Sequence, residues 1–353
     1  MTPGVSIDAD AWMHRAVGLS ATALPHPNPR VGALVFDRAG GEVGSGVHRV
    51  AGDDHAEIVA LASAGDAARG GTLVVSLEPC DHQGLTPPCT EAIITAGIDR
   101  VIVGALDPDA RVSGQGVARL REAGIDVTGP TATAAVEAND PAYFHHRRTG
   151  RPLVTLKWAM TLDGQVAGAD GTSKWITGDE ARRDAHRLRA ASDVVVVGAG
   201  TVRADDPRLD VRLEDHVGPQ PRPVIVAGED PLPGDAALWS RDPLVYSAKP
   251  VDTPSGEVVV LSGPAGVDLD AMIKDLESRG TLGILVEGGP GLAGALWSNG
   301  LVDRVVAYAG AKVGGGSGLA PLDGVFPTVA DATVVSITSV ELLGDTVKIM
   351  GDC

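Results

Sequence analysis

Cysteine and aromatic residues are scarce in this chain of 353 residues, and basic residues are outnumbered by acidic ones. There are three cysteines, a small odd number that argues against a disulfide framework and favours a reducing compartment. Aromatic residues make up 3% of the chain, which leaves few flat surfaces on which bases could stack. The 29 Lys and Arg against 46 Asp and Glu give a net charge of −17, which repels a phosphate backbone. We therefore expect no nucleic-acid partner, and a small molecule as the substrate of any enzyme.

Long apolar runs are also missing. No uninterrupted apolar stretch approaches the roughly 20 residues of a membrane span, so we expect no membrane partner. Residues 1–11 lack the basic patch and apolar run of a signal peptide, which favours a soluble, cytoplasmic protein. A length of 353 residues, with 44% hydrophobic residues, is suited to two domains.

Extended and helical patterns alternate in the first half of the chain. Hydrophobic spacing and turn residues predict helices over 8–22, from 55 onward, from 89 onward and over 116–123, and strands over 30–36, 41–48, 72–77, 100–106 and 125–128. Asp53 and Asp54 are expected to cap the helix that opens at His55. This order predicts an α/β sandwich around a mostly parallel sheet.

The most informative motif is His55-Ala56-Glu57, followed by Pro79-Cys80 and Cys89. A pattern of H-x-E with a later P-C and a second Cys marks zinc nucleobase deaminases, although eight residues separate the cysteines here instead of two. His55 and Cys89 fall at predicted helix starts, where the helix dipole favours a thiolate. Two thiolates and one imidazole leave the fourth tetrahedral position of zinc open, as in catalytic sites.

Glu57 is the candidate proton shuttle of this site. Zinc lowers the pKa of a bound water to about 7, and Glu57, in the first helical turn, can carry a proton from water to departing ammonia. There are two alternatives to a catalytic site. A His-Ala-Glu sequence by itself is usually part of a solvated helix face. A structural zinc site would need a fourth ligand, which His82 could supply. The placement of His55 and both cysteines at strand and helix ends favours the deaminase.

Residues 143–152 are basic and rich in turn formers, which is typical of a linker. We therefore expect one domain over 1–148 and another over 149–353. Strands are predicted over 153–160, 194–197, 224–226, 258–261 and 283–286, with helices over 179–191, 269–279 and 292–297. The strands over 194–197, 224–226 and 258–261 are expected to be buried. Two glycine-rich turns follow strands, at 198–203 and 288–291; each is either a phosphate cradle or a tight turn without a ligand.

Both halves together resemble the bifunctional deaminase–reductase family of riboflavin biosynthesis over nearly the whole chain. The segments that carry the resemblance are 27–32, 55–57, 77–84, 86–89, 156–164, 173–177, 200–207 and 286–290. The resemblance implies a cytidine-deaminase-like three-layer domain followed by a dihydrofolate-reductase-like domain. It implies zinc-dependent deamination of 2,5-diamino-6-(5-phosphoribosylamino)pyrimidin-4-one, then NADPH-dependent reduction of the ribosyl chain to ribityl. We also expect one Zn²⁺ per chain and a homo-oligomer.

The resemblance assigns roles to individual residues. His55, Cys80 and Cys89 would bind zinc beside the catalytic Glu57, and Asn28 and His48 would contact the pyrimidine. The residues expected to contact NADPH are Ala159, Trp175, Thr201, Asp205, Gly289, Pro290, Gly291, Leu292, Ala293, Gly294 and Ala295. Those expected to hold the phosphosugar are Ser173, Arg189, Leu209, Arg212 and Glu287, with Lys157 beside the ribosyl carbon. Taken singly, Trp175 could be ordinary core and Arg189 an exposed helix charge.

One position departs from the family pattern. Leu85 stands where the family usually carries Arg or Lys, a natural phosphate partner. We hypothesise that Arg30 compensates for the missing charge; an unchanged deaminase Michaelis constant in Arg30→Ala would contradict this. Two alternatives stay open: a single-function small-molecule zinc deaminase with a non-catalytic C-terminal domain, and a non-enzymatic, zinc-stabilised binding module.

Overall fold

The computed structural model describes residues 9–83, 87–110, 112–228, 230–316, 318–324 and 328–353. The chain divides into two compact units, residues 1–150 and 151–353. Within the described ranges, no helix is both long enough and apolar enough to cross a membrane. Leu85 lies outside the described residues.

The first unit is built on a five-stranded sheet in the order β2-β1-β3-β4-β5. Its strands are β1 (Gly32–Phe36), β2 (Glu42–Val47), β3 (Thr72–Leu77), β4 (Arg100–Ala105) and β5 (Asp126–Thr128). β1 pairs antiparallel with β2 and β3, whereas β3 with β4 and β4 with β5 are parallel. The sheet is therefore mixed, which corrects the mostly parallel sheet expected from the sequence: a tight hairpin between β1 and β2 joins only antiparallel strands.

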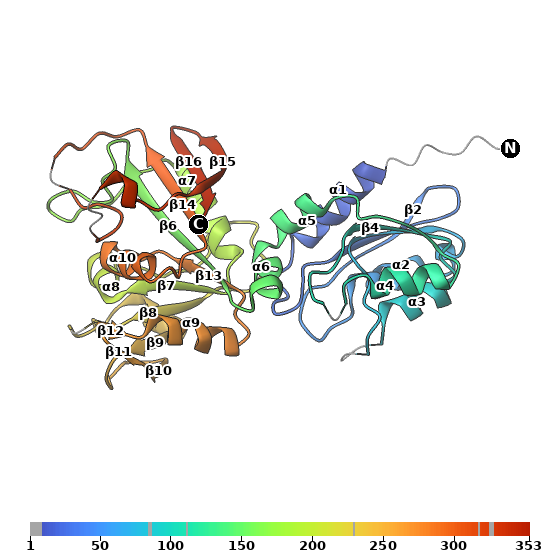
Figure 1. The fold of residues 1–353 in the computed structure, drawn as a ribbon, viewed down its shortest axis with the longest axis horizontal. Coiled ribbons are helices and arrows are strands. Elements are labelled where there is room, and N and C mark those ends of the chain that lie inside the picture. The colour runs from blue at the N-terminus through green and yellow to red at the C-terminus, as the bar shows by residue number, and fades with distance from the viewer. Residues whose placement is uncertain (1–8, 84–86, 111, 229, 317, 325–327) are drawn as a thin grey trace. The chain divides into compact units, whose positions relative to one another are not determined.

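Helices cover both faces of this sheet, which gives three layers (Figure 1). One face carries α1 (Ala9–Ser20) and α5 (Thr133–Asn139); the other carries α2 (Ala56–Ala64), followed by the short helix η1 (Gly65–Ala68), α3 (Cys89–Ala96) and α4 (Gln115–Glu122). Every residue of β1 and β3 is buried. Continuous burial is expected where a sheet is covered on both sides, and it makes β3 a rigid support for Cys80.

Most of the segment expected to be a linker is a helix, α6 (Pro141–Thr149). The Asp140 side chain accepts a hydrogen bond from the Tyr143 backbone N–H at its start, and Gly150 ends it in the left-handed region. Tyr143 and Phe144 are buried, so the helix is anchored by one apolar edge. The run of His and Arg obscured that edge, although an Asp-Pro start and a Gly stop were present in the sequence.

The second unit contains a nine-stranded sheet in the order β10-β9-β8-β7-β13-β6-β14-β16-β15. Its strands are β6 (Leu153–Thr161), β7 (Val194–Gly198), β8 (Arg222–Val226), β9 (Leu244–Ser247), β10 (Glu257–Val260), β13 (Gly283–Val286), β14 (Arg304–Gly310), β15 (Ser336–Leu343) and β16 (Thr346–Asp352). Pairing is parallel from β10 to β14 and antiparallel for β14 with β16 and β16 with β15. β11 (Ser262–Gly263) and β12 (Gly266–Val267) form a separate small hairpin.

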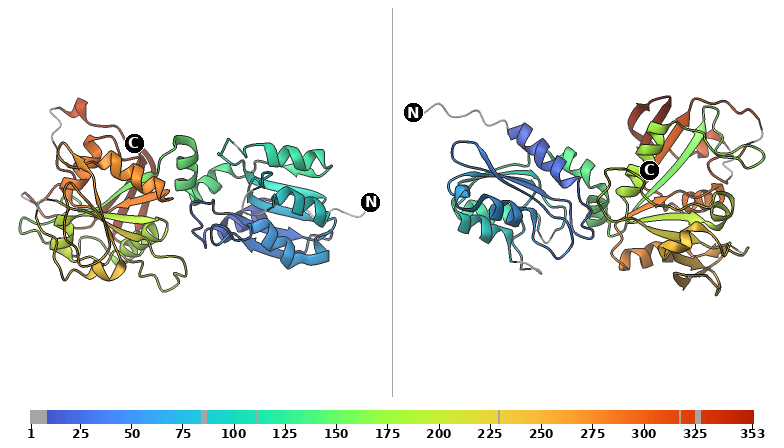
Figure 2. Two further views of the ribbon diagram at one scale, coloured as in Figure 1. Left: turned by 90° about the horizontal axis from the view of Figure 1, so that it is seen from below. Right: turned by 180° about the vertical axis from the view of Figure 1, so that it is seen from behind.

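Helices also cover this sheet on both faces, as the further views in Figure 2 show. Val194 and Val196 of β7 belong to the core beneath α9 (Leu269–Ser278) and α10 (Pro290–Ser298). Val195 and Val197 point the other way, into a core shared with α7 (Asp179–Ala190), α8 (Ala199–Asp205) and η2 (Ala237–Arg241). Successive strand residues face opposite sides, so one apolar strand serves two cores. A short helix, η3 (Val329–Asp331), precedes β15.

The strand expected to be buried over residues 258–261 is an edge strand instead. It corresponds to β10, whose two ends are exposed, with Val260 45% exposed. Its apolar composition resembles that of the central strands, but it has a partner on one side only. Sequence pattern alone does not distinguish the two positions, because position in a sheet depends on the order of strands in space.

Candidate active sites

His55, Cys80 and Cys89 come together in the first unit, with their donor atoms within 4.8 Å of one another. His55 Nδ1 lies 3.2 Å from Cys89 Sγ and 3.6 Å from Cys80 Sγ. A tetrahedral zinc with bonds of roughly 2.0–2.3 Å places nitrogen and sulfur ligands about 3.5 Å apart. The two distances from the imidazole to the thiols therefore fit zinc, and the two thiols lie within 4.8 Å of each other. Among the described residues, His82 lines the same cavity but is not part of this three-donor cluster.

The local structure explains how these ligands converge. His55 is the N-cap of α2, Cys80 follows β3 after a short link, and Cys89 is the first residue of α3. Asp53 and Asp54 were expected to cap α2, but the helix begins one residue after His55, whose side chain makes no capping bond. The imidazole is thus available to the thiols and not used by the helix end.

Glu57 lines the same cavity, which has a volume of about 270 Å³. The residue is 3% exposed. Burial raises the pKa of Glu57 to about 7, and the charge of Cys80 adds to this rise. The hydrogen bond from Cys89 lowers the pKa of Cys80 to about 4, while the same contact and burial raise the pKa of Cys89. The carboxyl of Glu57 can therefore both hold and release a proton near neutral pH, as a proton shuttle must.

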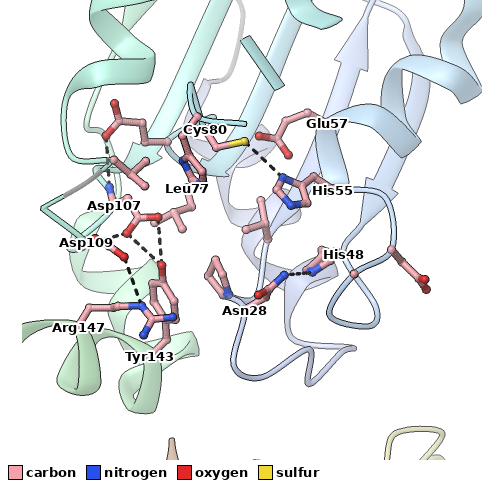
Figure 3. A pocket seen from close by; sticks show the side chains of 17 residues that line it. Asn28, His48, His55, Glu57, Leu77, Cys80, Asp107, Asp109, Tyr143 and Arg147 are labelled. Carbon is pink, nitrogen blue, oxygen red and sulfur yellow. Dashed lines mark hydrogen bonds and ion pairs between the residues drawn. The ribbon is translucent and has the colours of Figure 1, made fainter. Parts of the chain in front are cut away.

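Asn28 and His48 form a hydrogen-bonded pair in the wall of this cavity (Figure 3). His48 Nδ1 lies 3.1 Å from the carbonyl oxygen of Asp54, so Nδ1 carries the proton and donates it. His48 Nε2 is then an acceptor for Asn28 Nδ2 at 3.0 Å. Burial lowers the pKa of His48, which agrees with a neutral ring. The pair orients the Asn28 amide, leaving its oxygen as an acceptor.

Four polar residues of the cavity wall were not predicted from the sequence: Asp107, Asp109, Tyr143 and Arg147. The Tyr143 hydroxyl donates to Asp107 at 3.1 Å, and burial raises the pKa of Asp107 to about 6. Asp107 and Asp109 follow β4 as Cys80 follows β3, at the carboxyl ends of neighbouring parallel strands. That placement was a usable signal, because ligands commonly bind at this edge of a sheet.

The second unit contains a larger cavity of about 720 Å³. Its volume lies within the usual range for cofactor sites. Most of the residues predicted to hold NADPH or the phosphosugar line it: Lys157, Ala159, Ser173, Trp175, Arg189, Thr201, Asp205, Leu209, Arg212, Glu287, Gly289, Pro290, Gly291 and Leu292. The structure does not bring Ala293, Gly294 or Ala295 into the described lining. Ala293 belongs to the core, and Gly294 packs against the backbone at Asp323.

Glu287 is the centre of a charge cluster in this cavity. It accepts two hydrogen bonds from the Arg189 guanidinium, at 2.7 and 3.0 Å, and lies 3.7 Å from Lys157 Nζ. Burial alone would raise the pKa of Glu287, but Lys157 and Arg189 outweigh it and lower the pKa to about 2. Glu287 is therefore a fixed negative charge. Arg189 is not an exposed helix charge, since its side chain is 13% exposed.

The glycine-rich turn before α10 is held by a residue of helix α8, Thr201. The Gly289 backbone N–H donates to Thr201 Oγ1 at 3.0 Å, and Ser173 donates to Asp205 at 3.3 Å across the cavity. Helix starts leave backbone N–H groups without helical partners, so the first residues of α10 suit an anionic cofactor. Trp175 is 60% exposed and is not core; its ring stacks 4.5 Å from the Arg182 guanidinium.

Leu209 has a positive φ of 55°, uncommon for a leucine, although its side chain is buried. This backbone is part of the cavity wall. Arg212, in the same wall, donates to the carboxylate of Asp210 at 2.5 Å. Non-glycine residues with positive φ cluster at ligand sites, which agrees with a ligand-shaped loop here.

Comparisons with known proteins match both units of the chain. Residues 6–105 match the cytidine and deoxycytidylate deaminase zinc-binding region, and residues 152–348 match the RibD C-terminal domain. The chain is 40% identical over 330 residues to the riboflavin biosynthesis protein RibD of Aquifex aeolicus, covering 91% of each chain. It is 35% identical over 357 residues to that of Escherichia coli, covering 94% of this chain and 96% of the other.

Solved structures are similar over the full length. The diaminohydroxyphosphoribosylaminopyrimidine deaminase/5-amino-6-(5-phosphoribosylamino)uracil reductase of Thermotoga maritima superposes with a TM-score of 0.87 at 33% identity, covering 98% of each chain. A RibD structure from Acinetobacter baumannii also gives 0.87, at 32% identity and the same coverage.

Fold and sites thus define a zinc-binding deaminase domain joined to an NADPH-dependent reductase domain. The chain belongs to the RibD family of riboflavin biosynthesis proteins. It is a bifunctional enzyme, a hydrolase and an oxidoreductase in one polypeptide. A single-function deaminase with a non-catalytic partner domain is not favoured, and neither is a non-enzymatic zinc module.

Proposed function

We propose that the first domain deaminates 2,5-diamino-6-(5-phosphoribosylamino)pyrimidin-4-one and that the second reduces the ribosyl chain of the product to ribityl. The observation that carries the first step is the three-donor cluster of His55, Cys80 and Cys89 in one cavity with buried Glu57. The substrate is the one in the name of the Thermotoga maritima relative, which is similar over 98% of the chain. The second cavity, with its fixed charges, supports the reduction.

In the deaminase step, His55, Cys80 and Cys89 would hold zinc, which supplies activation of water when bound. Glu57 takes one proton from water and delivers it to the leaving amine, so that water and the amino group become a ring carbonyl and ammonia. Its pKa of about 7 supports both halves of this transfer. Asn28 offers its amide oxygen to an N–H of the pyrimidine, held in place by His48.

In the reductase step, bound NADPH supplies a hydride for the ribosyl carbon. Lys157 and Glu287 lie side by side in the cavity, and we assign them to the sugar next to that carbon. Ser173, Arg189, Leu209 and Arg212 complete the phosphosugar site. The residues assigned to NADPH are Ala159, Trp175, Thr201, Asp205 and Gly289–Leu292. Ala293 and Gly294 are buried in the helix that follows, and Ala295 is exposed on it.

The test supplies the pyrimidinone substrate and NADPH to the zinc-loaded protein and follows ammonia release and NADPH absorbance together. We expect ammonia first and NADPH oxidation after it. Ammonia without NADPH oxidation would contradict the reductase assignment. Absence of both, in protein shown to contain zinc, would contradict the proposed substrate.

Three further properties are proposed here. We place the domain boundary between Arg148 and Thr149; the compact units divide two residues further on. We propose a homo-oligomer, because edge strand β15 exposes Ile337, Val340 and Leu342 at 57, 64 and 74%. Light scattering tests the oligomeric state, and a monomer at micromolar concentration would contradict this proposal.

We propose a cytoplasmic location because a reducing compartment keeps Cys80 and Cys89 available as zinc ligands. Cell fractionation tests this location.

A further inference from the structure

The deaminase cavity has an uneven distribution of charge. Its described lining includes five carboxyl side chains, but one guanidinium, Arg147, and no lysine. The five acids are Asp53, Glu57, Glu78, Asp107 and Asp109. A phosphorylated substrate brings about two negative charges at pH 7, and acidic walls repel it unless a cation faces the phosphate. The position of that cation decides which end of the cavity receives the phosphate.

Arg30, the residue hypothesised to compensate for Leu85, is not brought to this cavity. Its backbone N–H donates to Asp140 and its guanidinium donates to the carbonyl oxygen of Asn139 at 3.3 Å. It is absent from the described lining of the cavity. These contacts tie together the loop before β1 and the start of α6, which is a structural role.

Arg147 is held in the cavity wall by its neighbours and keeps donor capacity. Its guanidinium lies 4.8 Å from the centre of the Tyr143 ring and donates to the Pro27 carbonyl at 3.0 Å. It also donates to His146 Nδ1 at 3.0 Å. Nε is buried and makes no hydrogen bond to any described residue, but it forms an ion pair with Asp109 Oδ2 at 3.8 Å. The guanidinium is thus pre-oriented but incompletely satisfied.

We propose that Arg147 binds the 5-phosphate of the deaminase substrate, with Asp109 beside it accepting from a ribose hydroxyl. A phosphoribosyl group presents hydroxyl donors next to phosphate acceptors, and a carboxylate next to a guanidinium complements both. Figure 3 shows Arg147 and Tyr143 projecting from α6 on one side of the cavity, with His55 and Glu57 on another. The phosphate is thereby kept away from the reacting amine. This assignment rests on the proposed substrate.

Arg148 is a matched control on the same helix. It stacks on Phe144 at 5.3 Å, much as Arg147 stacks on Tyr143, but pairs with Glu137 and is absent from the described lining of the cavity. The experiment compares Arg147→Gln and Arg148→Gln on the phosphorylated pyrimidinone and on its dephosphorylated form, with zinc content and NADPH-dependent reduction of the deaminated product measured alongside.

We expect Arg147→Gln to raise the deaminase KM for the phosphorylated substrate by roughly ten- to hundredfold, since charge-assisted hydrogen bonds are lost. Its kcat/KM for the dephosphorylated substrate should match that of the wild type, and Arg147→Lys should recover part of the loss. Arg148→Gln should change neither. An unchanged KM in Arg147→Gln, or an equal loss on both substrates, would overturn the proposal. If the wild type failed to deaminate the pyrimidinone, the proposed function itself would fail, a distinguishable result.

Discussion

The two domains each place a buried glutamate in a ligand cavity, and the two carboxyls have opposite character. Glu57 has no positive partner strong enough to outweigh its burial, so its pKa rises to about 7. Glu287 is as deeply enclosed, but Lys157 and Arg189 lower its pKa to about 2. The first can exchange a proton at neutral pH and the second cannot. Burial alone therefore does not decide what a carboxyl does; its charged neighbours do.

The two cavities also differ in their size and in the residues that line them. The deaminase cavity is about 270 Å³ and brings a metal-ligand cluster and a proton carrier together at helix and strand ends. The reductase cavity is about 720 Å³ and is built from fixed charges and a glycine-rich turn. In the function proposed above, the small cavity would perform proton chemistry with its own side chains, and the large one would orient a cofactor that carries the reactive hydride.

Removal of zinc should separate the two activities most sharply. Dialysis against a chelator should abolish ammonia release, because His55, Cys80 and Cys89 would hold the zinc that activates water. Reduction of the deaminated product by NADPH should persist, since no described ligand cluster lies in the second domain. Added Zn²⁺ should restore deamination, as followed by an ammonia assay. Ammonia release that survives verified zinc loss would contradict the zinc site.

Glu57→Gln should reduce kcat for deamination by about 10²–10⁴-fold, the usual effect of losing a positioned acid–base group. Gln has nearly the same shape but cannot carry a proton, so zinc content should be unchanged. Reduction of the deaminated product serves as the internal control. A variant with normal ammonia release would remove Glu57 from the mechanism.

Glu287→Gln tests the other glutamate. It leaves Arg189 and Lys157 without their negative partner in a partly buried site, which should lower the free energy of unfolding by about 3 kcal/mol. Reductase KM should rise, while deaminase kcat stays at the wild-type value. Urea denaturation and the two assays measure this. A more stable variant would show that the charge cluster costs more in desolvation than it returns.

The pH dependence of stability should reveal the low pKa of Glu287. Its folded pKa of about 2 lies below the unfolded value near 4.5, so its contribution is fully present above about pH 4.5 and is lost as pH falls towards 2. The gap in unfolding free energy between wild type and Glu287→Gln should be constant from pH 7 to 5. It should narrow between about pH 4.5 and 2, by up to about 3 kcal/mol at ~1.4 kcal/mol per pH unit. If the difference in unfolding free energy widened on acidification, the folded-state pKa of Glu287 would be raised and not lowered, which would contradict this prediction.

Thr201→Val should have the smallest effect. It removes the acceptor for the Gly289 N–H and loosens the turn before α10 by about 1 kcal/mol. We expect a rise of roughly fivefold in the KM for NADPH, with deamination unaffected. Thr201→Ser keeps the hydroxyl and is the matched control. Equal effects of both substitutions would point to packing and not to the hydrogen bond.

Much of the deaminase site was accessible from sequence because its parts are local. The zinc ligands occupy a helix cap, a strand exit and a helix start, each with its own residue signature. The reductase contacts came from resemblance, since Trp175 and Arg189 carry no local signal. The sequence predicted neither the helix α6 nor the edge position of β10. A basic run is compatible with a linker or a helix, and an apolar run with a central strand or an edge strand.

The sequence by itself determined the zinc donor set, the alternation of strands and helices, and the family, because each is encoded in short-range spacing and residue chemistry. Tertiary structure alone decided which charges meet. Arg189 and Glu287 are 98 positions apart and Arg147 lies 120 positions from Pro27, yet both pairs are in hydrogen-bond contact. Spacing along a chain does not specify such contacts, which arise only when packed sheets and helices bring distant segments together. The roles of the two glutamates depend on those contacts.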